Sequence, residues 1–240
     1  MITAHADIVG SLLRPPELLL AQKQLAAGAI TTAEFKAIED RAVDDAIALQ
    51  ESVGLEVVSD GEMRRQSFQS QMTAAVSGFG EFDRDAFLWG EWHDEHGVQK
   101  KPRPRRLGAN AKLKRIRYLS ADEFLYLKSK SSRIPKITLP SPSLWANFWS
   151  PRYSRHAYPT LDAFLADIVA ILRDEVTELV RLGAAYIQID APHYGLLLDP
   201  KTRPFYEARG WSLKQWLSLG IDLDNAVTSG FSTVTFGFHV

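Results

Sequence analysis

Residues 160–190 read TLDAFLADIVAILRDEVTELVRLGAAYIQID, and this stretch decides the fold. After Thr160, apolar residues recur three and four positions apart until Gly183, which is the pattern of an amphipathic helix with a glycine at its end. Residues 185–189 then form a short apolar run that leads into Asp190. A helix followed at once by a buried strand is the repeating unit of α/β proteins.

The same order of features occurs earlier in the chain. Thr31 and Glu34 fit a capping box, and apolar residues at helical spacing run from there to Gly54. Residues 55–59 then predict a strand that ends in Asp60-Gly61-Glu62. Two such units indicate that the helix-then-strand order is the plan of the whole chain.

Further short, apolar, β-branched runs predict more strands. They lie at residues 7–11, 136–139 and 233–238, with one more near residue 115. About six strands alternating with helices predict an α/β fold, and the pattern leaves a barrel and an open sheet as alternatives. Ligand sites of parallel α/β folds lie at the carboxyl ends of the strands, so the polar residues at these ends predict one common site.

The composition is that of one globular domain over residues 1–240, with 45% hydrophobic and 24% charged residues. With 28 Lys and Arg against 29 Asp and Glu, the net charge of −1 gives no overall field that favours nucleic acid or an anionic membrane. No apolar run approaches a membrane span, and the N-terminus lacks signal-peptide character, so we expect a cytoplasmic protein. The absence of cysteine excludes disulfides, thiolate nucleophiles and cysteine-ligated metals within these residues.

Residues 78–118 interrupt the regular pattern. Aromatic and charged residues come first, and nine Lys or Arg lie between Lys100 and Arg117. We interpret this segment as a hairpin-like excursion whose basic part is a solvated loop. It lacks the aromatic interleaving of a nucleic-acid binder. Directly after it, Ser120 and Glu123 predict a capping box for the next helix.

Four polar motifs lie at predicted strand ends, namely Val9-Gly10-Ser11, Ser59-Asp60-Gly61-Glu62, Gln188-Ile189-Asp190 and Phe238-His239. Each alone has a simpler explanation. Gly10-Ser11 suits a tight turn before a helix that starts with proline. Asp60 and Glu62 suit a turn that caps the next helix.

Residues beside these motifs also have two interpretations. Arg64 and Arg65 predict ion pairs at the rim of the barrel, with a substrate carboxylate as the alternative. Gln188 is expected on the opposite face of its strand from the aspartate that ends it. Trp145 and Trp149 fit either a stack on a flat ring or aromatic core packing.

In this order, the four motifs resemble the cobalamin-independent methionine synthase family, specifically its catalytic C-terminal barrel and its shorter single-barrel relatives. The resemblance spans residues 7–240 and includes Gly220-Ile221-Asp222-Leu223-Asp224-Asn225. It implies a (β/α)8 barrel of the uroporphyrinogen-decarboxylase-like kind. The implied activity is methyl transfer from a methyltetrahydrofolate to the sulfur of homocysteine bound on zinc. Coordination by the metal would deprotonate the thiol and keep it reactive.

The resemblance also implies roles for individual residues. Glu62 and Asp190 would bind the ammonium of the amino acid, and Gly10 with Ser11 its carboxylate. The folate nitrogen needs a proton donor, for which Asp190 and His193 are the candidates. The further substrate-binding candidates are Asp60, Gln188 and Trp149, and the candidate zinc ligand is His239. The basic run then has a second interpretation, as a docking surface for a polyglutamate tail.

The sequence departs from the family pattern at two places. The family carries a cysteine two residues after the histidine that matches His239, whereas this sequence ends at Val240. We therefore expect a C-terminally incomplete barrel with an incomplete zinc site. Ala191 stands where the methionine synthases carry Glu, which favours the shorter relatives. The open edges of such a sheet predict pairing with another copy of the chain.

Two other functions stay open at this point. Zinc-dependent alkyl transfer of the epoxyalkane–coenzyme M type shares the barrel and the metal, but a sulfonate thiol would call for cations where Glu62 and Asp190 stand. The other alternative is a catalytically inactive module that binds folate or an amino acid. Methyl transfer by the protein would exclude this second alternative.

Overall fold

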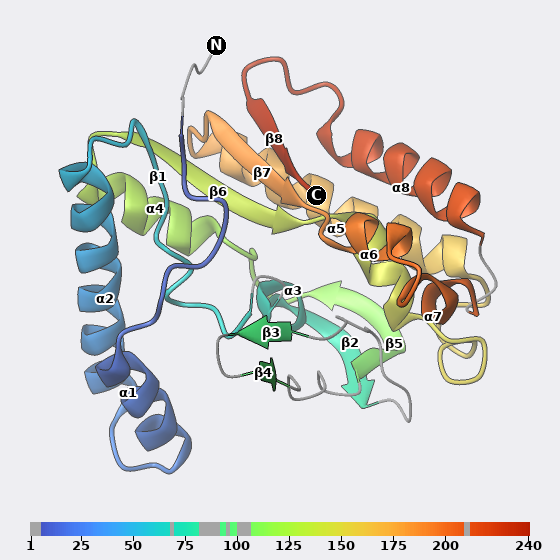
Figure 1. Cartoon of the computed structure of the whole chain (residues 1–240), viewed down its shortest axis with the longest axis horizontal. Helices are drawn as coiled ribbons and strands as arrows, with labels where there is room; N and C mark the ends of the chain where they lie inside the picture. Colours follow the sequence, from blue (N-terminus) through green and yellow to red (C-terminus); the bar gives the residue numbers. More distant parts are fainter. Residues whose placement is uncertain (1–5, 68–69, 82–91, 95–96, 100–106, 209–211) are drawn as a thin grey trace.

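The computed structural model describes residues 6–67, 70–81, 92–94, 97–99, 107–208 and 212–240 (Figure 1). Helices and strands alternate along most of the chain. In order they are α1 (Pro16–Ala26), α2 (Thr32–Ser52), β1 (Val57–Val58), α3 (Ser70–Ala75), β2 (Val76–Glu81), β3 (Trp92–Asp94), β4 (Gly97–Gln99), β5 (Leu107–Arg115), α4 (Ala121–Lys130), β6 (Ile134–Pro140), the 3-10 helix η1 (Pro142–Phe148), α5 (Leu161–Arg181), β7 (Tyr186–Asp190), α6 (His193–Leu198), α7 (Arg203–Glu207), α8 (Leu213–Thr228) and β8 (Thr235–His239).

Four strands form a parallel sheet in the order β1-β6-β7-β8 (Figure 1). Among the described residues this sheet is open, with β1 and β8 at its edges. The register pairs Pro140 with Asp190 and Asp190 with His239. The polar residues that end β7 and β8 therefore lie side by side at the carboxyl end of the sheet.

The two helix-to-strand units that the sequence predicts are confirmed. Thr31 caps α2 in a capping box with Glu34, and the side chain of Thr160 caps α5. Gly54 and Gly183 follow these helices with φ of +81° and +96°. Glycine reaches this left-handed conformation without the clash that a Cβ would cause, so each helix can turn sharply into its strand.

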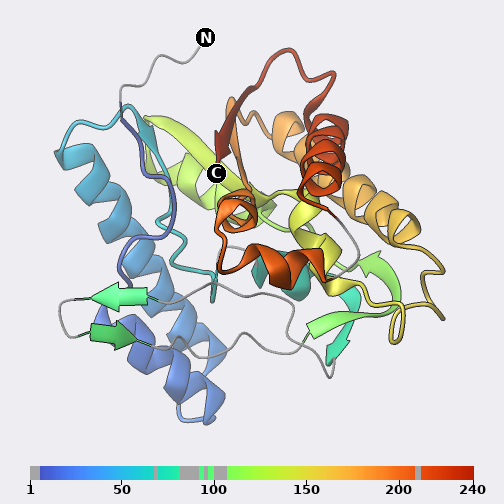
Figure 2. The ribbon, with the colours of Figure 1, turned by 45° about the vertical axis from the view of Figure 1, so that its right-hand side comes forward.

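Two of the expected strands lie outside the parallel sheet. Residues 7–11 form no strand, because the carbonyl oxygens of Ile8 and Val9 accept hydrogen bonds from the side chains of Lys136 and Gln188. The segment near residue 115 belongs to β5, which pairs antiparallel with β2 instead. The β2–β5 pair lies apart from the parallel sheet in both views of the molecule (Figures 1 and 2).

The capping box predicted for α4 is wrong. Ser120 makes no side-chain cap, and the carboxylate of Glu123 instead accepts a hydrogen bond from Arg65 Nη2 at 2.8 Å, far away in sequence. The backbone N–H groups of Leu119 and Ser120 donate instead to the buried carboxylate of Glu175, at 2.7 and 2.8 Å. Tertiary contacts have replaced the local cap.

Buried apolar side chains form two clusters. The larger contains residues of β6, β7, η1, α5 and α8, with Trp145, Phe164 and Trp216 among its buried members. The smaller joins α1, α2 and α4 to β1 and includes Leu18 and Val43. Figure 2 shows α1 and α2 toward the β1 edge of the sheet, and α5 and α8 toward the edge formed by β7 and β8. None of the helices in the described ranges is long and apolar enough to span a membrane.

Tyr158 holds the described part of the basic excursion against α5. Its fully buried hydroxyl accepts from Leu113 N and donates to Asp167 Oδ2, both at 2.7 Å. Lys112 Nζ lies 4.1 Å from the centroid of the Tyr158 ring, within the range of a cation–π contact. Residues 100–106, which hold five of the nine Lys and Arg of the basic run, lie outside the described residues, so the interpretation of the run as a solvated or docking loop stays a prediction.

We expect Tyr158→Phe to lower the free energy of unfolding by about 1–3 kcal/mol, because the Leu113 N–H loses its partner and the Asp167 carboxylate keeps only Lys112 Nζ at 3.4 Å. Urea denaturation measures this change, with an unchanged slope against urea. Tyr118→Phe at the surface is the matched control and should stay within about 0.5 kcal/mol of the wild type. A Tyr158→Phe protein as stable as the control would contradict the role of this hydroxyl.

Candidate functional site

Four side chains from distant parts of the chain meet at the carboxyl end of the sheet, and we call Ser11, Glu62, Asp190 and His239 the strand-end cluster. Ser11 Oγ donates to Glu62 Oε2 at 2.5 Å, and His239 Nδ1 lies 3.3 Å from Asp190 Oδ1. Burial raises the pKa of Asp190, and the negative charge of Glu62 raises it further. The structure thus brings together the four residues that the strand ends predict.

A tight turn after β1 directs Glu62 into the cluster. Gly61 and Glu62 have φ of +66° and +55°, and a positive φ is uncommon for a residue with a side chain. Asp60 Oδ1 accepts from Glu62 N at 2.9 Å. Arg14 Nη2 donates to the carbonyl oxygens of Glu62 at 2.9 Å and Arg65 at 2.5 Å. Such strained conformations persist only where several contacts enforce them, and they concentrate at functional sites.

Asp60 lies beneath this turn rather than beside Ser11. It is 3% exposed, and its Oδ2 has no hydrogen-bond partner among the described residues. Burial raises the pKa of Asp60 to about 6, an effect that the charge of Glu123 increases and that of Arg65 opposes. Through Oδ1, Asp60 holds the main chain of Glu62, while Oδ2 is left with acceptor capacity.

The face predicted for Gln188 is wrong. Residues two apart on a strand lie on the same face, so Gln188 shares the face of Asp190. Its Nε2 donates to Asp190 Oδ1 and to Val9 O, both at 2.6 Å. Its Oε1 accepts from the buried Lys136 Nζ at 2.8 Å. Gln188 therefore orients Asp190 and fastens the segment that leads to Ser11.

Gly10 and Trp149 have different surroundings. A Cβ added to Gly10 would meet nothing within 4 Å, so there is open space beside the residue that precedes Ser11. Trp149 packs against the larger core cluster, and its Nε1 donates to Tyr158 O at 3.0 Å. Trp145 is fully buried in the same core. The contacts that the structure gives these two indoles are those of core packing.

His193 lies in a second, fully buried polar group. Its Nε2 is 2.8 Å from Ser143 Oγ, and Nδ1 has no partner among the described residues. Burial lowers the pKa of His193 to about 3, so the imidazole is neutral near pH 7. Ser143 Oγ continues to Ser141 Oγ at 3.0 Å and to Tyr194 at 3.3 Å. The structure therefore gives this predicted catalytic residue a contact in a buried serine–tyrosine network rather than one with the residues of the strand-end cluster.

The network ends on Asp224, which sequence reasoning did not single out. Its Oδ1 accepts from Ser141 Oγ at 2.7 Å and its Oδ2 from Tyr194 OH at 2.8 Å. Asp224 follows Gly220 by four positions on the buried stripe of α8, and a carboxylate on such a stripe is the signal that could have revealed it. A Cβ at Gly220 would lie 2.1 Å from Tyr194 OH, so only glycine leaves room for that hydroxyl.

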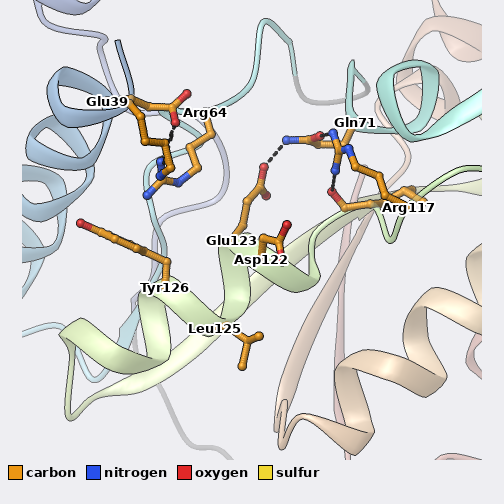
Figure 3. Close-up of a pocket in the computed structure, with 10 residues that line it drawn as sticks. Glu39, Arg64, Gln71, Arg117, Asp122, Glu123, Leu125 and Tyr126 are labelled. Atoms are coloured by element: carbon orange, nitrogen blue, oxygen red, sulfur yellow. Dashed lines mark hydrogen bonds and ion pairs between the residues drawn. The ribbon is translucent and has the colours of Figure 1, made fainter. Parts of the chain in front are cut away.

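Arg64 and Arg65 point in opposite directions. Arg64 forms ion pairs with Glu39 and Asp40 at 2.5 Å each. Arg65 is 2% exposed, so its predicted place on the rim is wrong, and the buried carboxylates that surround it explain why. A pocket of about 620 Å³ lies between α2 and α4. Figure 3 shows Arg64 and Glu123 among the residues that line it.

No family model matches this sequence. The methionine synthase of Pyrococcus furiosus is 28% identical over 236 residues, which cover 98% of this chain and 60% of the relative. The 5-methyltetrahydropteroyltriglutamate–homocysteine methyltransferase of Thermosynechococcus vestitus is 30% identical over 205 residues, 85% of this chain and 25% of the relative. An uncharacterised Bacillus subtilis protein, YxjH, is 25% identical over 86% of this chain and 52% of its own length.

This chain is homologous to the methionine synthases. It spans little more than half of the Bacillus and Pyrococcus relatives. Two solved structures share its fold at 19% identity. A Listeria monocytogenes protein described as a vitamin-B12-independent methionine synthase matches with a TM-score of 0.71, over 98% of this chain and 64% of its own. A B12-independent methionine synthase from Shewanella, in complex with selenomethionine, matches with a TM-score of 0.61, over 88% and 54%.

The structural likeness to these methionine synthases confirms the predicted α/β barrel type, and the described sheet is an open one of four parallel strands. The family implies zinc, for which His239 is the predicted ligand. Among the described residues, however, no group of three His, Asp or Glu side chains is arranged to hold a metal ion. Asp190 and His239 alone do not make a zinc site, so the residues present do not fit this metal.

Asp224 predicts a pH dependence of stability. Burial raises its pKa from 3.8 to about 6, so between these values the folded protein holds a proton that the unfolded chain has released. Stability should therefore fall as the pH rises from about 4 to 6. Relative to Asp224→Asn, the wild type should lose about 2 kcal/mol over this range in urea denaturation. The exposed Asp222→Asn on the same helix is the control, and an equal pH profile for both variants would contradict the prediction.

Proposed function

We propose that this chain binds a homocysteine-like amino acid at the strand-end cluster and serves methyl transfer to its sulfur. The observation that carries the proposal is the pair of buried carboxylates, Glu62 and Asp190, which approach closely enough for the charge of one to raise the pKa of the other. The homology to methionine synthases supports the same reaction class.

The two carboxylates suit an ammonium group. Glu62 is 2% exposed and Asp190 is 4% exposed, so their mutual repulsion is only weakly screened by water. A ligand cation between the two carboxylates would offset this repulsion. A neutral ligand would leave the repulsion in place, and an anionic ligand would add to it. The α-ammonium of an amino acid is a cation of this size.

The other end of the amino acid is assigned to Gly10 and Ser11. Ser11 is exposed and already directs its hydroxyl to Glu62, and open space adjoins Gly10. A carboxylate there would accept from the hydroxyl and from main-chain N–H groups, while the ammonium meets Glu62 and Asp190. The site would thus bind a zwitterion at both ends and leave the thiol side chain to project from it.

Asp190 is our choice as proton donor to the leaving nitrogen of a methyltetrahydrofolate. The name of the Thermosynechococcus relative gives a methyltetrahydrofolate as its methyl donor, in the form of 5-methyltetrahydropteroyltriglutamate. Loss of the methyl group leaves a nitrogen anion that must be protonated, and the sulfur that gains the methyl group must lose its proton. Asp190, ionised while it faces the ammonium, would accept the thiol proton and pass it to this nitrogen. Asp190 lies in the cluster with a raised pKa, whereas His193 is fully buried and neutral near pH 7, with its pKa at about 3. The proposal includes no step through zinc.

A specific observation weighs against the sulfonate alternative. An acceptor thiol that ends in a sulfonate, as in the epoxyalkane–coenzyme M type of transfer, would need cations in place of Glu62 and Asp190. Lys136 of β6 has a buried ammonium, but this ammonium already donates to Asp7 Oδ2, Ile8 O and Gln188 Oε1. The charges of the cluster favour the amino acid.

We expect Glu62→Gln and Asp190→Asn each to weaken L-homocysteine binding at least about tenfold, because each variant removes one charge that faces the ammonium. Isothermal titration calorimetry of the whole chain measures the affinity, and transfer of an isotope-labelled methyl group from methyltetrahydrofolate measures activity. Glu17→Gln, an exposed residue of α1, is the control and should bind as the wild type does.

The outcomes separate the functions. Binding that depends on Glu62 and Asp190 without methyl transfer would favour the inactive binding module. No binding of L-homocysteine by the wild-type protein would refute the amino-acid site. Equal affinities of the wild type and both cluster variants would place the ligand elsewhere.

A further inference from the structure

Arg65 is the buried cation behind the strand-end cluster. It faces three buried carboxylates, those of Asp60, Glu62 and Glu123. Burial alone would lower the pKa of Arg65, but the charges of Glu123, Glu62 and Asp60 hold it above its ordinary value. The guanidinium is therefore charged at every pH at which the protein is folded, and it compensates part of a large buried negative charge.

All three nitrogens of the Arg65 guanidinium are engaged. Nε and Nη2 donate to Glu123 Oε2 at 3.1 and 2.8 Å. Nη1 donates to Thr138 Oγ1 at 2.7 Å and to Glu62 Oε1 at 3.3 Å. A planar fork can bind one carboxylate along one edge and a second acceptor pair along the other, whereas a lysine ammonium is a single point.

Thr138 connects this cation to Glu62 a second time. Its Oγ1 donates to Glu62 Oε1 at 2.7 Å while it accepts from Arg65. One carboxylate oxygen of Glu62 thus has two donors from behind, and the other faces Ser11. These contacts leave the carboxylate a single orientation, with Oε2 toward the cluster.

A further layer fixes Glu123. Gln71 Nε2 donates to Glu123 Oε1, and Arg117 Nη2 donates to Gln71 Oε1 at 2.8 Å (Figure 3). Both carboxylate oxygens of Glu123 are therefore occupied, one by Gln71 and the other by Arg65. The chain of contacts runs without a break from the pocket between α2 and α4 to the strand-end cluster.

We infer that Arg65 is a positioning residue that holds the Glu62 carboxylate toward the ammonium of the bound amino acid, an inference that rests on the proposed amino-acid site. A merely structural role would be complete with the Arg65–Glu123 pair alone. The two roles differ in one measurable property, which is the preference of the site for a ligand that carries an ammonium.

The test compares L-methionine with 4-(methylsulfanyl)butanoate, the same molecule without its ammonium, by calorimetry on the whole chain. We expect the wild type to bind L-methionine at least about tenfold more tightly. Arg65→Lys keeps the charge but loses the fork, and it should reduce this ratio to less than about threefold. Arg64→Lys, the same substitution one residue earlier, should keep the wild-type ratio because Arg64 pairs with Glu39 and Asp40 outside the cluster.

A second variant covers the case in which Arg65→Lys does not fold. Arg65→Met combined with Glu123→Met removes the buried pair and leaves neither of its charges alone. It should fold and lose the preference for the ammonium. A wild-type ratio in either variant would overturn the inference and leave the amino-acid site standing. A wild-type protein that binds neither ligand, or both equally, would overturn the inference and the proposed site together.

Discussion

The compensation of buried negative charge is the constraint on which the strand ends depend. Asp60, Glu62 and Glu123 are each less than 5% exposed, and Arg65 lies among them. Taking charged groups out of water is costly unless opposite charge and hydrogen bonds replace the water. This requirement brings the turn after β1, the end of β6 and the start of α4 together, at a turn in which Glu62 has a left-handed backbone.

A second buried polar network joins the end of β6 to α6 and α8. Asp224 on α8 binds Ser141 at the end of β6 and Tyr194 on α6, so three elements converge on one buried carboxylate. The Arg65 group reaches Thr138 of β6 and the Asp224 group reaches Ser141 directly after it, so both networks attach to the strand that pairs with β7. Buried networks of hydrogen bonds rigidify their surroundings because displacement of one member leaves a polar group unpaired. Within the strand-end cluster, the side chain of His239 is 41% exposed, whereas that of Asp190 is 5% exposed.

Local sequence patterns predicted most of the helices and strands. The polar residues at the carboxyl ends of the predicted strands indicated where the candidate site lies. Helical spacing and a closing glycine were enough for α2 and α5, because these signals depend on near neighbours. The supports of the site were not predictable in this way. In the sequence, Glu123 fits a capping box, but its carboxylate binds Arg65, 58 positions earlier. Residues 7–11 fit a strand, but side chains of other segments bind their carbonyl oxygens instead. Spacing cannot reveal which buried partner a polar residue will meet.

The attachment of residues 7–9 has a kinetic consequence. Lys136 and Gln188 hold this segment by individual side-chain contacts to Asp7, Ile8 O and Val9 O, whereas β6 and β7 are held by a continuous ladder. Opening a ladder requires many hydrogen bonds to break together, but a segment tethered at a few points can detach alone. Its amide hydrogens should therefore exchange with deuterium well before those of the neighbouring strands. Since Ser11 follows directly, the serine side of the cluster would be the part that adjusts when a ligand enters.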